Sequence, residues 1–147
     1  MFLRLLANLA VLCITASAFA EPVPESVLGV YARPQKSCFT SAEGEWCEGF
    51  RNETIAIRRR TKELAYVGVD LIFFNGHRCS YYGVGRWRDG KLVASSSNPF
   101  SRNICRLEVS IDGTSASFKK HSGDCDPVGF CSARGSLSGG RGFIREP

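Results

Sequence analysis

The chain has 147 residues, a formal net charge of +5 and a hydrophobic content of 44%. These values exclude an intrinsically disordered or collagen-like chain, and the length suits one domain with a substantial core. Residues 51–102 carry ten basic and four acidic side chains, which makes the middle third a basic region on a nearly neutral body. Such a region favours acidic partners, although the same charges also serve to keep a protein in solution.

An apolar leader opens the chain. Arg4 supplies a positive charge, an apolar run from Leu5 to about Ala16 follows, and Ala18-Phe19-Ala20 places small residues around one position. This pattern predicts a cleaved secretory signal peptide over residues 1–20. The apolar run is too short for a membrane span. We therefore expect a single domain over residues 21–147, periplasmic or secreted from a bacterium, without stable membrane insertion.

The first part of this domain predicts little regular structure. A Pro-rich segment leads to a short helical turn that begins near Pro24. Residues 38–49 are rich in Glu, Gly and Ser and predict a loop, with Trp46 inside it.

From residue 54 onward the apolar pattern has a period of two, which predicts β-strands. Asn75-Gly76 separates two such runs and predicts a type I′ hairpin turn, which needs positive φ at both central residues. Asp89-Gly90 predicts a second turn. The expected strands are Thr54–Arg58, Leu64–Phe74, His77–Trp87, Lys91–Ser95, Cys105–Ile111, Thr114–Lys119, Phe130–Leu137 and Arg141–Arg145.

About seven to nine short strands with frequent turn signals predict an all-β fold. Strands linked by hairpins favour a small antiparallel β-barrel, because closure of the sheet removes exposed edges. A β-sandwich is the alternative.

Six cysteines follow the leader, at Cys38, Cys47, Cys79, Cys105, Cys125 and Cys131. An even number in an exported chain predicts three disulfides that brace the domain. The sequence alone does not choose among the many pairings. We favour Cys38–Cys47 and Cys125–Cys131, which would close short loops, and Cys79–Cys105, which would join two strands.

Patterns of catalytic residues are weak. His121, Ser122 and Asp124 are the residue types of a hydrolase triad, but neighbours in one loop rarely reach triad geometry and no G-x-S-x-G motif is present. Asp124 and Asp126 lack the further ligands of a calcium loop. We therefore expect no enzyme activity, no metal and no cofactor.

Two polar segments and one tyrosine supply candidate contact residues. Arg58-Arg59-Arg60 is the densest cationic run, and the polar stretch around Ser95-Ser96-Ser97 offers hydroxyl, amide and guanidinium groups. Exposed Tyr and Arg dominate binding hot spots, whereas export argues against a nucleic-acid partner. The candidate partner-binding residues are Arg58, Arg59, Arg60, Tyr82, Ser95, Ser96, Ser97, Asn98 and Arg102. Tyr81 and Tyr82 alternate on one predicted strand, so only one of them is expected at the surface.

Small exported proteobacterial proteins end in a cysteine loop that is similar to the segment Cys125-Asp126-Pro127-Val128-Gly129-Phe130-Cys131-Ser132-Ala133-Arg134-Gly135-Ser136-Leu137 of this chain. With its leader, size and cysteine-rich strand pattern, the chain resembles the periplasmic lysozyme inhibitors. The resemblance implies a small β-barrel that places loops in the cleft of a peptidoglycan-cleaving enzyme. Ser95-Ser96-Ser97 is only a loose counterpart of the Ser-Gly loop in that group, so no inhibitory residue is transferred.

We therefore expect a non-enzymatic periplasmic protein that binds and blocks a peptidoglycan hydrolase, such as a lysozyme or a lytic transglycosylase. The basic middle third favours a less basic target, because charges of like sign disfavour docking. A small-ligand-binding barrel and a structural or adhesive module of the envelope are the alternatives. An interior filled by Val67, Leu71, Phe73, Leu107 and Val109 would exclude the ligand-binding barrel.

Overall fold

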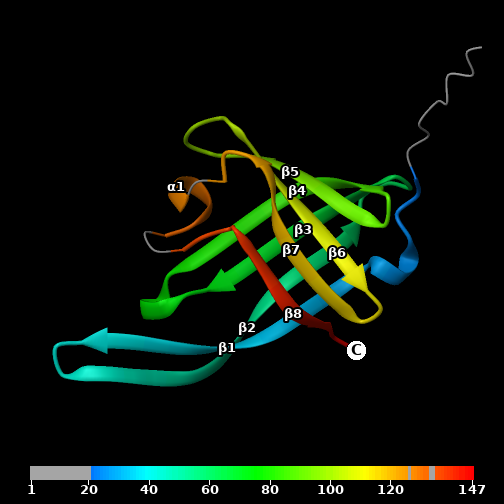
Figure 1. The fold of residues 1–147 in the computed structure, drawn as a ribbon. Coiled ribbons are helices and arrows are strands. Elements are labelled where there is room, and N and C mark those ends of the chain that lie inside the picture. Colours follow the sequence, from blue (N-terminus) through cyan, green and yellow to red (C-terminus); the bar gives the residue numbers. More distant parts are fainter. Residues whose placement is uncertain (1–20, 126, 133–134) are drawn as a thin grey trace, which may run out of the picture.

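The structure is a computed structural model that describes residues 21–125, 127–132 and 135–147. Eight antiparallel strands follow one another around a closed barrel, and the last strand pairs with the first (Figure 1). The expected all-β barrel is confirmed, and the sandwich alternative does not apply. The expected signal peptide lies outside the described residues.

The strands are β1 (Gly29–Ser41), β2 (Gly44–Arg59), β3 (Leu64–Ile72), β4 (Arg78–Arg88), β5 (Lys91–Ser97), β6 (Ile104–Asp112), β7 (Ser115–Gly123) and β8 (Gly139–Arg145). Three short turns of helix are η1 (Glu25–Val27), η2 (Phe74–Gly76) and α1 (Pro127–Phe130). In the described part of the chain, no helix is long and apolar enough to cross a membrane.

Two element predictions are wrong. Residues 38–49 are not a loop, because β1 and β2 remain paired as far as Ser41 and Gly44. The strand expected at residues 130–137 is absent from the described part of that range, where α1 ends and Cys131 forms isolated bridges with Cys79 and Val128. Residues 133–134 lie outside the described residues.

The hairpin turns form as expected. Asn75 and Gly76 have φ of 58° and 69°, and Asp89 and Gly90 have φ of 50° and 75°. Both central residues of each turn are therefore left-handed, as a type I′ turn requires. Asn, Asp and Gly adopt this conformation at low cost, so these two short sequences determine where β3, β4 and β5 reverse direction.

The alternating side chains of the strands fill the barrel. The largest fully buried side chains include Tyr31, Tyr81, Phe143, Ile55, Leu92 and Leu107. Burial of each large apolar side chain contributes about 1.5–3 kcal/mol. The residues named as a test for a filled interior, Val67, Leu71, Leu107 and Val109, are all buried, and Phe73 packs against them. The ligand-binding alternative therefore gains no support from the interior.

One ion pair with a buried carboxylate and a partly exposed guanidinium lies where β1, β2, β3 and β8 meet. Glu53 is 3% exposed and is the cross-strand partner of Arg33, whose Nε and Nη2 both donate to Glu53 Oε2. The backbone N–H of Ile72 donates to Glu53 Oε1 at 2.9 Å. Arg33 also donates to the carbonyl of Arg141 at 2.6 Å and lies over the Phe143 ring at 4.6 Å. A single carboxylate thus connects four strands, and it was not anticipated from the sequence.

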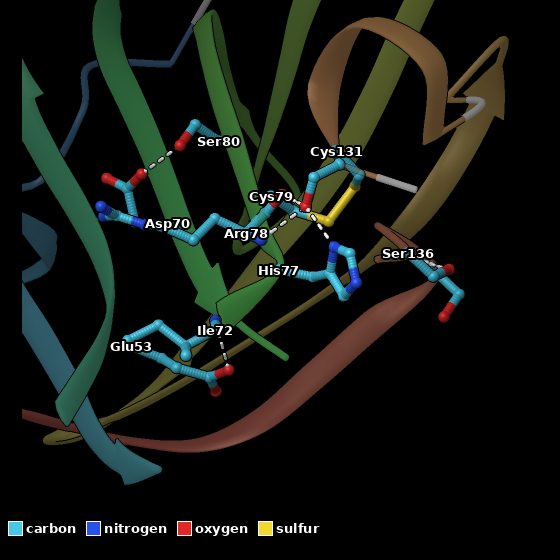
Figure 2. Close-up of a disulfide and its surroundings, with 11 residues drawn as sticks. Glu53, Asp70, Ile72, His77, Arg78, Cys79, Ser80, Cys131 and Ser136 are labelled. Carbon is cyan, nitrogen blue, oxygen red and sulfur yellow. Dashed lines mark hydrogen bonds between the residues drawn. A yellow bond between two sulfur atoms is a disulfide. The ribbon is translucent and has the colours of Figure 1, made fainter. Parts of the chain in front are cut away.

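The three disulfides are Cys38–Cys47, Cys79–Cys131 and Cys105–Cys125. The first pair was expected, and the other two expected pairings are wrong. Cys79 and Cys105 cannot be direct neighbours in the sheet because β5 lies between their strands. The segment after β7 instead brings Cys125 to β6 and Cys131 to β4, as Figure 2 shows for the Cys79–Cys131 bridge.

Candidate binding surfaces

A hollow lies on the outer wall of the barrel, across β2 to β5. It has a volume of about 780 Å³, and its lining includes Arg58, Tyr66, Asp70, Tyr82, Ser95 and Ser96. We call it the wall groove. Strand pairing explains its floor, because Ala56, Gly68 and Tyr82 follow one another in a row across β2, β3 and β4. The Tyr82 ring lies 3.3 Å from where a Cβ on Gly68 would stand, so the absence of a side chain at Gly68 makes room for this ring.

Two tyrosines stand at the wall groove. Tyr66 is 51% exposed and Tyr82 is 66% exposed. Tyr66 pairs with Val84 and Tyr82 pairs with Gly68, so the two tyrosines are diagonal neighbours on adjacent strands. Diagonal Cβ atoms are about 7–8 Å apart, which is within reach of large side chains. The two rings can therefore contact one extended ligand together.

Asp70 orients the Tyr82 ring. The Tyr82 hydroxyl donates to Asp70 Oδ2 at 3.1 Å. The Ser80 hydroxyl donates to Asp70 Oδ1 at 2.6 Å, as Figure 2 shows. Desolvation, followed by the neighbouring Asp70 carboxylate, raises the pKa of Tyr82 above its ordinary value. The phenol consequently stays protonated and remains a hydrogen-bond donor well above neutral pH.

Several residues expected to bind a partner come together here. Arg58, Tyr82, Ser95 and Ser96 all line the wall groove, although they come from three strands. Arg60 lies beside it, with its guanidinium 5.4 Å from the centre of the Tyr66 ring. Tyr82 is exposed and Tyr81 is buried, as alternation along β4 requires.

The other candidates do not line the groove. Arg59 donates to Glu25 at 2.7 Å and to the carbonyl of Val23 at 2.8 Å, so it holds the N-terminal segment against the barrel. Ser97 and Arg102 are exposed outside the groove lining.

Asn98 has a structural position. It is buried, its Oδ1 accepts the backbone N–H groups of Phe100 and Ser101, and its Nδ2 donates to the carbonyl of Val128 at 2.9 Å. These contacts organise the loop between β5 and β6, so the Asn98 amide is not presented to a partner.

A second hollow of about 750 Å³ adjoins the wall groove and shares Val84 and Ser95 with it. Its lining includes Arg86, Arg88 and Arg106. These three arginines and Arg58 of the wall groove form no ion pair with any carboxylate of the described residues. The outer wall therefore presents several arginines whose charge is not neutralised within the protein.

Glu108 is a carboxylate on the same wall, and three basic groups surround it. Its oxygens lie 3.0 Å from Lys91 Nζ, 3.2 Å from Lys119 Nζ and 3.5 Å from His121 Nδ1. The hydrogen bond from Lys91 is the largest cause that lowers the pKa of Glu108. His121 thus faces Glu108, and no hydrogen bond joins it to Ser122 or Asp124 among the described contacts.

A projecting hairpin forms the second surface. The β1–β8 pairing includes only Tyr31 and Ala32, and the β2–β3 pairing starts at Thr54. Residues 33–41 and 44–53 consequently pair only with each other, and Figure 1 shows them extending away from the barrel. At about 3.3 Å per residue, this hairpin reaches roughly 25 Å. We call it the stapled arm.

Three contacts brace the stapled arm. The Cys38–Cys47 disulfide links its strands, and the Phe39 and Trp46 rings stack beside it with centroids 4.7 Å apart. Asn75 Oδ1 of η2 accepts the backbone N–H of Thr40 at 2.7 Å. The arm is therefore supported both across its own strands and from the neighbouring turn.

The outer part of the arm is aromatic and acidic. Trp46 is 51% exposed and Phe50 is 72% exposed. The stretch of residues 41–48 contains three glutamates and no basic residue, namely Glu43, Glu45 and Glu48. Sequence reasoning missed this surface. Its signal was the mirrored order of Cys38-Phe39 and Trp46-Cys47 around a Gly-containing turn, which is typical of two paired strands.

The described residues contain one cluster with the spacing of metal ligands, formed by Cys38, Glu45 and Cys47. Both of its sulfur atoms belong to the disulfide, so the cluster is a structural staple and not a metal site. Asp126, considered with Asp124 for calcium, lies outside the described residues.

Comparison with protein families, curated proteins and solved structures found no match to this chain. Its function is therefore inferred from the two surfaces, the wall groove and the stapled arm.

Proposed function

We propose that this protein is a periplasmic inhibitor that blocks a peptidoglycan-cleaving enzyme by placing the stapled arm in the enzyme's cleft. The observation that carries the proposal is a braced hairpin, aromatic and acidic, that extends beyond the barrel. The leader predicted from the sequence and the three disulfides support a location outside the reducing cytoplasm.

Rigidity supports an inhibitory role. An isolated two-stranded hairpin is marginally stable in water, and ordering it on binding would reduce the affinity. The Cys38–Cys47 bridge and the Phe39–Trp46 stack order the arm before any partner arrives. The binding free energy of Trp46 and Phe50 is then available for the contact, and exposed aromatic residues of this kind often dominate interfaces.

Charge supports this choice of target. Peptidoglycan carries carboxylates, so an enzyme that cleaves it gains from a positively charged cleft. The three glutamates of residues 41–48 are complementary to such a cleft. The like-charge objection raised by the basic middle third does not apply to the tip of the arm, because residues 41–48 carry glutamates and no basic residue.

The test is a titration of the mature, oxidised protein against a panel of lysozymes and lytic transglycosylases acting on a soluble oligosaccharide substrate. We expect micromolar or stronger inhibition of at least one enzyme at a stoichiometry of one to one. Trp46→Ala should weaken this inhibition by about 10- to 100-fold. Phe100→Ala is the matched control, because Phe100 is an exposed aromatic residue outside the arm. If no enzyme is slowed, or if Trp46→Ala inhibits as well as the parent protein, the proposal is wrong.

A further inference from the structure

We infer that the wall groove is a second binding site, independent of the stapled arm, and that it takes a carboxylated glycan strand. Its ligand class is a polysaccharide that carries carboxylates at regular intervals, and the choice of the peptidoglycan strand as the probe rests on the proposed function. The inference rests on the juxtaposition of two exposed tyrosines, one hydrogen-bonded carboxylate and several unpaired arginines on one side of the barrel.

The shape of the groove fits an extended polymer. The wall groove continues into the hollow lined by Arg86 and Arg106, and the two share Val84 and Ser95. Together they cross the outer wall from β2 to β6. A compact small molecule would not need a surface of this length, whereas successive sugars of a strand would occupy it.

The tyrosines provide the stacking surfaces. Outward residues on a solvated sheet face are usually polar, so two large exposed rings side by side are unusual there. The small floor at Ala56 and Gly68 leaves the Tyr66 and Tyr82 rings open to solvent. The flat C–H face of a pyranose packs against such rings, while Asp70 Oδ2 and the Ser95 hydroxyl lie nearby to bind ring substituents.

The arginines select for charge. Arg58, Arg86 and Arg106 have no carboxylate partner among the described residues. An arginine binds a carboxylate with two parallel hydrogen bonds, which makes it a strong and directional partner. A strand with a carboxylate at regular intervals would neutralise these side chains, and a neutral polysaccharide would leave them unpaired.

An acidic peptide fits this surface less well. Peptides that add to a sheet need an unpaired strand edge, and β4 is paired with both β3 and β5 over residues 84–86 of the groove. A strand whose successive sugars offer flat C–H faces, with carboxylates at regular intervals, would use the tyrosines and the arginines together.

The probe is a set of soluble glycan strands from peptidoglycan whose peptide stems have been removed, which leaves a free lactyl carboxylate on every second sugar. Binding is measured by calorimetry at physiological salt with the mature, oxidised protein. We expect saturable binding, about tenfold weaker for Tyr66→Ala or Tyr82→Ala and weakened also by Arg58→Ala. Tyr82→Phe retains the ring and should keep most of the affinity. Strands with amidated carboxyl groups should bind about tenfold more weakly.

Two control variants separate this site from the stapled arm. Phe100→Ala and Trp46→Ala should bind the glycan as the parent protein does, whereas only Trp46→Ala should lose inhibition of an enzyme. Absence of glycan binding, or binding that the tyrosine and arginine variants leave unchanged, would overturn the inference. Equal binding of polyglutamate or of a sulfated glycan would also overturn it, because charge alone would then explain the affinity.

Discussion

Glu53 joins three neighbouring strands, because it lies on β2 and its carboxylate accepts hydrogen bonds from β1 and β3. It is nearly inaccessible to water and accepts hydrogen bonds from Arg33 and from the backbone of Ile72. A buried ion pair adds little over an apolar pair of the same shape, but removal of one partner leaves the other charge uncompensated.

We therefore predict that Glu53→Gln lowers the free energy of unfolding by about 1–3 kcal/mol, a large part of the stability of a small domain. Urea denaturation followed by circular dichroism measures this change. Glu45→Gln is the control, because Glu45 is an exposed residue of the arm. A loss of less than about 1 kcal/mol for Glu53→Gln would mean that the pair is not a structural requirement.

Glu108 gives the protein a predictable response to acid. The pKa of Glu108 is lowered in the folded protein from its ordinary value of 4.5, chiefly by the hydrogen bond from Lys91. The unfolded chain therefore binds a proton more readily than the folded protein does. The stabilisation is complete above the ordinary pKa and is lost as the pH falls through the lowered folded-state value.

Accordingly, Glu108→Gln should reduce the stability difference between neutral pH and about pH 3. The measurement is the urea midpoint of both proteins across this pH range. Asp112→Asn is a suitable control, because Asp112 is exposed and has no ion pair among the described contacts. Parallel pH curves for Glu108→Gln and the parent protein would contradict the expected linkage.

At the residue scale, alternation along the strand was enough to predict that only one of Tyr81 and Tyr82 is exposed, because neighbours on a strand face opposite sides. The same reasoning could not separate Arg58 from Arg59 by function. Arg59 is occupied by Glu25, which is 34 residues away in sequence, and only the closed barrel brings the two together. The local sequence pattern thus predicts on which side of the sheet a side chain lies, but not which residue it contacts.

The stapled arm is the element that links fold and proposed function. Its disulfide closes a separation of 9 residues outside the barrel, whereas Cys79–Cys131 closes a separation of 52 and ties the end of the barrel to β4. In the chain-entropy description, the longer loop gives the larger stabilisation.

Replacement of both cysteines by serine should therefore affect chiefly stability for one bridge and chiefly inhibition for the other. Loss of Cys79–Cys131 should cost about 2–5 kcal/mol of stability. Loss of Cys38–Cys47 should cost less but weaken enzyme inhibition more, because the arm is no longer ordered in advance. Chemical denaturation and inhibition assays on both double variants check this. The proposed role of the arm fails if the Cys38–Cys47 variant inhibits normally.

Strands and tight turns could be predicted at the element scale because short sequence signals determine them. Asn75-Gly76 and Asp89-Gly90 are such signals, and both turns formed. The arm was missed because its Glu, Gly and Ser residues are typical of loops, and its pairing depends on a disulfide and an aromatic stack. Two disulfide pairings were wrong because the sequence after β7, which carries Cys125 and Cys131, has no periodic signal that shows which strands it approaches.

At the scale of the whole molecule, a cluster of negative charges and a cluster of positive charges lie on different parts of the surface. The glutamates of residues 41–48 extend to one side, and the arginines around the wall groove lie on the barrel itself. The overall net charge averages these two regions with the rest of the chain, so it does not indicate what either surface would bind. The barrel architecture followed from hairpin-linked alternating strands, whereas both binding surfaces depend on register between strands, which composition does not reveal.

The most direct test of the proposed function is amide hydrogen exchange on the mature, oxidised protein, alone and bound to the peptidoglycan hydrolase that it inhibits most strongly. We predict that binding slows exchange within residues 38–50 and leaves the wall strands β3 and β4 unchanged. An inhibited complex in which residues 38–50 exchange as fast as in the free protein would contradict insertion of the stapled arm.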